Sequence, residues 1–159
     1  MFEFELGEIE KEFGAEQGLI LNFRALDIIR PVILKNNGIE LEDVLWIFED
    51  STDALKSAVD IRNSMKEYNA CHHDAKDHIG VSGYGVHSGE ILFFEGTDIH
   101  WGDPVNTSSK LGQDLAEDGD ILVMPCIYNN CKNSGYFQKL IFTEKILQRS
   151  KVDFQCYSV

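Results

Sequence analysis

The stretch from Gly85 to Leu111, GVHSGEILFFEGTDIHWGDPVNTSSKL, constrains the fold more than any other part of the chain. Its first half joins two runs of β-prone residues through Ser88-Gly89, and a short turn that contains glycine is typical of a β-hairpin. In its second half, Asp103 can cap a helix and Pro104 suits the first helical position. The stretch therefore predicts a hairpin that turns near Ser88-Gly89, then a loop, then a helix that begins near Asp103.

The residues before this stretch alternate between helical and strand patterns. Apolar residues recur at helical spacing from Leu19 to Ile33, and Asn-Asn-Gly at 36–38 ends the pattern. Pro31 lies inside it, so we expect this helix to be kinked or divided. The continuous apolar run from Val44 to Phe48 predicts a central buried strand. The polar residues at 50–53 then supply capping oxygens for another helix.

The two ends of the chain show weaker patterns. Residues 1–18 begin with the alternation of a strand and continue with glutamates that suit an exposed helix. Residues 121–123, 136–143 and 151–159 read as strands. Helices and strands alternate early and strands dominate late, so we expect one α+β domain over residues 1–159, with helices layered on a sheet.

The charge excludes some classes of partner. The formal net charge is −13, so the surface repels nucleic acid and anionic membranes, and we expect neither as a partner. No apolar run approaches the roughly 20 residues of a membrane span. The start of the chain is acidic, unlike a secretory signal peptide, and we expect four free cysteines in a reducing, cytoplasmic compartment.

Four short motifs together resemble a known family. They are GVHSGEIL, WGDPVN, the pair Lys110-Leu111, and GDILV at 119–123. This set is similar to the catalytic homology domain of class III adenylyl and guanylyl cyclases, and the resemblance runs from about Leu21 to the C-terminus. It implies a mixed, mainly antiparallel sheet with helices packed on it. It also implies conversion of ATP or GTP into a cyclic nucleotide and pyrophosphate, at sites shared by two paired domains.

The resemblance assigns roles to particular residues. Asn106 matches the asparagine that positions the ribose, and Lys110 stands where the family usually has an arginine that stabilises phosphoryl charge. Glu42 or Asp43 stands where the family's second metal aspartate is expected, and both readings stay open. Such carboxylates hold Mg²⁺ or Mn²⁺. Asp98 is one position away from the aspartate that contacts the purine, so the choice between ATP and GTP stays open.

The sequence also departs from the family. Nothing in residues 1–18 resembles the strand that supplies the first metal aspartate, and Lys110 lacks the planar fork of arginine. We therefore predict little cyclase activity from this chain alone. One hypothesis is a divergent cyclase that acts as a homodimer or with a better-equipped partner domain. The alternative is a catalytically silent domain that works through dimerisation or ligand sensing.

For the polar connector at 69–78, for His87 and for Trp101, we expect structural roles rather than metal binding or catalysis. The connector at 69–78, NACHHDAKDH, invites a zinc hypothesis, but its composition is typical of a solvated loop and we expect no zinc there. His87 follows the family's strand histidine, and we expect a packed, hydrogen-bonded side chain. Trp101 is expected in the loop or at a dimer interface.

Overall fold

A computed structural model describes residues 2–4, 6–42, 44–94, 96–97, 99–117, 119–149 and 152–159. Asp43 and Asp98 lie outside the described residues. The first half of the chain contains β1 (Phe2–Phe4), α1 (Leu6–Phe13), α2 (Ala15–Lys35), β2 (Ile39–Glu42), β3 (Leu45–Ile47), α3 (Ser51–Cys71), η1 (Ala75–Asp77) and β4 (Val81–Val86). The second half contains β5 (Leu92–Phe93), β6 (His100–Trp101), α4 (Asp103–Ser109), η2 (Lys110–Leu115), β7 (Asp120–Val123), α5 (Pro125–Cys131), η3 (Gly135–Phe137), β8 (Thr143–Arg149) and β9 (Val152–Ser158).

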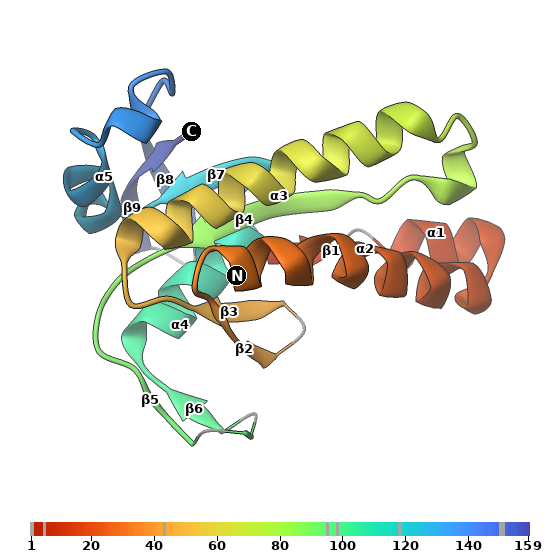
Figure 1. Cartoon of the computed structure of the whole chain (residues 1–159), viewed down its shortest axis with the longest axis horizontal. Coiled ribbons are helices and arrows are strands. Elements are labelled where there is room, and N and C mark those ends of the chain that lie inside the picture. The colour runs from red at the N-terminus through yellow and green to blue at the C-terminus, as the bar shows by residue number, and fades with distance from the viewer. Residues whose placement is uncertain are drawn as a thin grey trace.

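The main sheet has five strands in the order β1-β4-β7-β9-β8. Three of its four pairings are antiparallel, and the pairing of β4 with β7 is parallel. Helices α2 and α3 run beside this sheet (Figure 1). The structure therefore confirms the predicted α+β class, with a mixed and mainly antiparallel sheet.

The two faces of the sheet carry different partners. Tyr84, Val86, Ile121 and Val123 share one core cluster with α2 and α3. On the other face, Leu122 of β7 packs with buried side chains that include Leu111 of η2 and Cys156 of β9. Because successive side chains of a strand point to opposite faces, this alternation places a helical layer on each side of the sheet.

Helix α2 is continuous from Ala15 to Lys35 and contains Pro31, so of the two outcomes expected at this proline, a kink or a division, the division is wrong. Its end agrees with the predicted Asn-Asn-Gly stop: Asn37 has a φ of 59°, and the Gly38 amide donates to the Ile33 carbonyl at 2.9 Å. The buried face of α2 supplies a large part of the core, with Leu21, Ala25, Leu26, Ile29 and Ile33.

The predicted hairpin at Ser88-Gly89 is wrong. Strand β4 ends at Val86, and β5 pairs with β6 instead, so the hairpin turns within residues 94–99. The reason is that β1 and β7 already occupy the two edges of β4, which leaves no edge for the chain to fold back on. The predicted helix start at Asp103 is confirmed by α4.

Two other strand predictions need correction. The run from Val44 to Phe48 was expected to be a central strand, but β3 pairs with β2 in a separate two-stranded sheet. Leu45 and Trp46 are nevertheless buried, which explains the apolar run. Residues 136–143 were expected to be a strand, but they contain the end of η3 and a loop, and β8 begins only at Thr143. Residues 1–18 contain both of the elements that their pattern suggested, a strand and a helix.

A close backbone approach joins β4 to α4 and η2, the helical elements that follow β6. A Cβ added at Gly85 would overlap the Ser108 carbonyl oxygen and would lie 2.7 Å from the Gly112 amide nitrogen. These are backbone atoms, which cannot rotate away as side chains do. The contact therefore requires glycine at this position, and it fixes the distance between α4, η2 and the sheet.

We predict that Gly85→Ala destabilises the protein by about 1–3 kcal/mol or more, since the added methyl group meets backbone rather than a movable side chain. Chemical denaturation measures this change. Gly135→Ala is the matched control, because a Cβ there meets nothing within 4 Å and the residue is exposed. Equal stability of the Gly85 and Gly135 variants would contradict the close approach.

Candidate functional site

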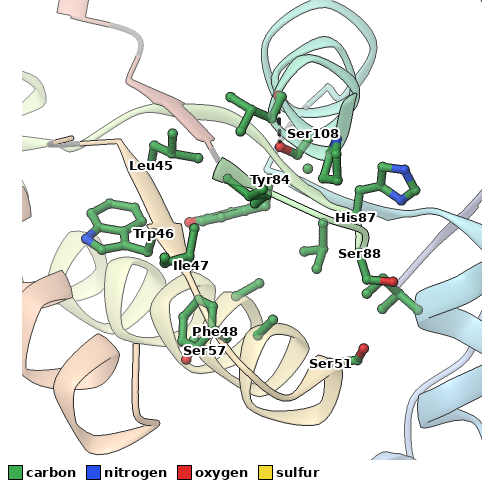
Figure 2. A pocket seen from close by; sticks show the side chains of 18 of the residues that line it. Leu45, Trp46, Ile47, Phe48, Ser51, Ser57, Tyr84, His87, Ser88 and Ser108 are labelled. Carbon is green, nitrogen blue, oxygen red and sulfur yellow. Dashed lines mark hydrogen bonds between the residues drawn. The ribbon is translucent and has the colours of Figure 1, made fainter. Parts of the chain in front are cut away.

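A pocket of about 190 Å³ lies between β3, the start of α3, the end of β4 and the start of α4. Leu45 and Trp46 stand at one end of it, and His87 and Ser88 at the other (Figure 2). Most of its other walls are apolar, and they include Ile33, Phe48, Ala58, Ile61, Tyr84, Val86, Pro104 and Val105. A space of this size and lining suits a small, mainly apolar group.

The hydroxyl of Ser57 is a polar group in the wall of this pocket. Its side chain is buried, with 1% of the residue exposed, and its hydroxyl has no hydrogen-bond partner among the described residues. It comes from α3, whose start is capped by Asp50: the Asp50 carboxylate accepts from the Thr52 amide at 2.6 Å, and this bond lowers the pKa of Asp50. A buried hydroxyl without a partner costs stability unless a ligand or water satisfies it.

The structure places Glu42 at the end of β2, where its carboxylate lies 3.5 Å from Nδ1 of His100 on β6. The pair links the β2-β3 hairpin to the β5-β6 hairpin. His100 was not singled out from the sequence, because a two-residue strand far along the chain leaves no local pattern that pairs it with Glu42. Asp43, the other metal candidate, lies outside the described residues.

The described residues do not fit a binding site for two divalent cations. No group of three or more His, Cys, Asp or Glu side chains within the described ranges is arranged to hold a metal ion. Glu42 lies beside His100, which is the one ion-pair contact that the described residues record for its carboxylate. A site for Mg²⁺ or Mn²⁺ built on Glu42 would therefore need ligands beyond these residues.

Asn106, in α4, and Lys110, the first residue of η2, are exposed and lie one helical turn apart. The Lys110 amide donates to the Asn106 carbonyl, so the backbone fixes their spacing. The Lys110 ammonium lies 5.9 Å from the centre of the Phe154 ring on β9. Both side chains are thus available on the surface, and no hydrogen bond or ion pair between described residues joins either of them to Glu42.

The polar connector proves to be attached to the protein rather than simply solvated. The Asp77 carboxylate accepts from Arg24 of α2 at 3.0 Å, and Gln17 of the same helix donates to the Lys76 carbonyl. His72 Nδ1 lies 2.7 Å from the Tyr68 carbonyl oxygen. These side chains serve as contacts within the protein, and the expectation that they hold no zinc stays a prediction.

Comparison with solved structures identifies the fold. The adenylyl cyclase CyaB from P. aeruginosa superposes with a TM-score of 0.74 at 17% identity, over 99% of this chain and 89% of that one. An adenylate/guanylate cyclase/hydrolase from Silicibacter pomeroyi gives 0.67 at 19% identity, over 82% and 76%. Adenylate cyclases from Trypanosoma brucei give 0.69 at 14% identity, over 99% and 84%.

At the level of sequence, neither a family model nor a curated protein matches this chain. The similarity to the cyclases is therefore carried by the three-dimensional arrangement. The chain has the fold of the class III adenylate/guanylate cyclase homology domain, as the motifs around Asn106 indicated.

The two buried serines of the pocket wall provide a test of its polarity. The Ser108 hydroxyl donates to the Val105 carbonyl at 3.1 Å, whereas the Ser57 hydroxyl has no partner within the described residues. We predict that Ser108→Ala lowers stability by about 1 kcal/mol and that Ser57→Ala leaves it unchanged or raises it. Thermal and chemical unfolding measure both. A comparable loss in both variants would show that something in the pocket satisfies Ser57.

Proposed function

We propose that this chain is a divergent nucleotidyl cyclase homology domain of cyclic-nucleotide signalling, and that it forms cyclic AMP or cyclic GMP poorly by itself. The observation that carries the proposal is the cyclase fold together with Asn106 of α4 and Lys110 of η2, which are exposed one turn apart just after the WGDP motif. Asn106 would orient the ribose, and Lys110 would lie near the phosphates.

The impairment follows from the chemistry that the proposal requires. Transfer at the α-phosphate relies on cations and preorganised positive charge. The described carboxylates do not gather into a set of metal ligands. Lys110 carries a charge, but it cannot make the bidentate contact of an arginine. With a net charge of −13, the surface also repels a triphosphate that carries no metal.

We infer that a partner domain supplies the remaining chemistry. Within the proposal, this chain supplies Asn106 and Lys110, and a second domain supplies the carboxylates that hold Mg²⁺ or Mn²⁺ and the nucleoside triphosphate. A homodimer would then stay weak, while a heterodimer with a complete cyclase domain would be active. No helix in the described part of the chain has the length and apolarity to cross a membrane, and we propose a cytoplasmic location.

We predict that this chain alone gives little cyclic nucleotide from Mn²⁺-ATP or Mn²⁺-GTP, and that mixing it with a cyclase domain that carries both metal aspartates restores turnover. In that mixture, Lys110→Arg is expected to raise the rate because a guanidinium can bridge two phosphate oxygens. Lys66→Arg, on the exposed surface of α3, is the matched control and should have no effect. Turnover by this chain alone within the ordinary enzyme range of roughly 1–10³ per second would overturn the proposed impairment.

A second candidate function is that of a silent domain that acts by association, and the β5-β6 hairpin favours it. Leu92 and Trp101 are cross-strand neighbours on one face of this hairpin, and they are 74% and 77% exposed. The opposite face carries His100, which is held by Glu42. Phe94 and Ile99 add further exposed apolar side chains close by. An exposed apolar surface of this kind is typical of a protein interface.

We predict that the chain self-associates through this arm. Leu92→Asp or Trp101→Asp should weaken the association at least tenfold, because each places a charge in an apolar contact. Sedimentation velocity across a concentration series measures it. Ile141→Asp is the control, since Ile141 is 82% exposed but lies in the loop before β8. A strict monomer at high concentration, or equal weakening by all three variants, would argue against the arm.

A ligand-binding experiment distinguishes the divergent cyclase from the silent domain. Calorimetric titration with a non-hydrolysable ATP analogue and Mn²⁺ should show binding that Asn106→Ala weakens, if the cyclase proposal holds. Self-association without any such binding would favour the silent domain instead.

A further inference from the structure

Three side chains from three separate elements form a line beside the pocket. His87 follows β4, Asp103 begins α4, and Cys126 belongs to α5. Nδ1 of His87 lies 3.3 Å from the Cys126 sulfur, and Nε2 of the same ring lies 3.8 Å from an oxygen of Asp103. A carboxylate, an imidazole and a thiol in this order form the arrangement that activates a nucleophilic cysteine.

The parallel pairing of β4 with β7 explains why these residues meet. Parallel strands end at the same edge of a sheet, and the pairing runs from Gly83 opposite Asp120 to Val86 opposite Val123. The Met124 amide donates to the Val86 carbonyl at 3.1 Å, which extends the pairing by one residue. His87 and Cys126 therefore leave the sheet side by side.

The protonation states follow from the surroundings of the ring. The His87 side chain is 14% exposed, and burial lowers its pKa, although the Asp103 carboxylate acts in the opposite direction. The groups that face the ring are Asp103 from α4 and Cys126 from α5. The tautomer that directs its Nε2 hydrogen to Asp103 leaves the Nδ1 lone pair free to accept the thiol proton.

We propose that Cys126 is a reactive thiol that exchanges with small disulfides, with His87 as its base and Asp103 as the residue that positions His87. In this step the Cys126 proton passes to Nδ1 of His87, and the sulfur attacks one sulfur of the disulfide. The disulfide bond breaks as the new sulfur–sulfur bond forms. The leaving thiolate takes the proton from the imidazolium, so the products are a mixed disulfide on Cys126 and one free thiol.

The other cysteines lack this arrangement and serve as references. Cys71 is exposed at the end of α3, with no hydrogen bond to an imidazole among the described residues. Cys131 and Cys156 are buried, and burial raises the pKa of both thiols, which keeps them protonated. Cys126 is only partly exposed, so faster reaction at Cys126 than at Cys71 would reflect activation rather than access.

The test uses 2,2′-dithiodipyridine, an uncharged disulfide whose approach the charge of −13 does not hinder. Release of thiopyridone gives the rate, and peptide mass spectrometry assigns the modified residue. At pH 7 we expect Cys126 to react at least tenfold faster than Cys71 in the same molecule. His87→Gln should lower the Cys126 rate about tenfold or more, since a positioned base is lost, and should leave Cys71 unchanged, which also reports an intact fold.

Asp103→Asn provides an independent measurement, because the Asp103 side chain is 86% exposed and its loss is expected to be tolerated by the fold. The carboxylate raises the pKa of His87, so its removal should move the acid limb of the Cys126 rate profile to lower pH and reduce the plateau. A purely structural role for Asp103 would not move the limb. Reaction at Cys126 no faster than at Cys71 in the unmodified protein would overturn the proposal, as would an unchanged rate in His87→Gln.

Discussion

The backbone contact between β4 and the helix that follows β6 holds the rest of the structure in place. Gly85 has no side chain, so Ser108 and Gly112 approach the strand to distances that any Cβ would prevent. This approach sets the depth of the pocket, since Tyr84 and Val86 line it from β4 while Val105 and Ser108 line it from α4. It also fixes the surface from which Asn106 and Lys110 project.

Local chemistry predicted the elements around this contact well, and long-range pairing explains where prediction failed. The start of α4 was readable because the preference of proline for the first helical turn acts locally, although Asp103 is the first helical residue and Gly102, not Asp103, occupies the N-cap position. The turn expected at Ser88-Gly89 was wrong because its prediction considered only the two flanking runs. Both edges of β4 pair with strands that are distant in sequence, β1 and β7. The residues around β4 do not indicate that these edges are already paired. The placement of β3 outside the main sheet, in a separate pair with β2, likewise depends on strand pairing that a local pattern does not reveal.

The candidate site divides in a similar way. Asn106 and Lys110 could be proposed as site residues because the motifs that carry them are contiguous, and their roles stay predictions. Glu42 was proposed as a metal ligand, and its contact with His100 was not foreseen, since that contact depends on how two small hairpins are placed. His87 was expected to be a packed, hydrogen-bonded residue, and the thiol that contacts it could be found only once the parallel register of β4 and β7 was known.

Helix α4 carries residues of both proposals: Asp103 belongs to the proposed thiol site, and Asn106 to the proposed nucleotide site. Asp103, its first residue, faces the partly buried imidazole of His87 and through it the Cys126 thiol. Asn106, further along α4, and Lys110, the first residue of η2, are exposed to solvent. The close approach at Gly85 holds α4 against β4, so Asp103 at the start of the helix keeps its place beside the end of the strand. The proposed thiol chemistry and the proposed nucleotide contacts therefore begin on the same short helix, which carries both Asp103 and Asn106.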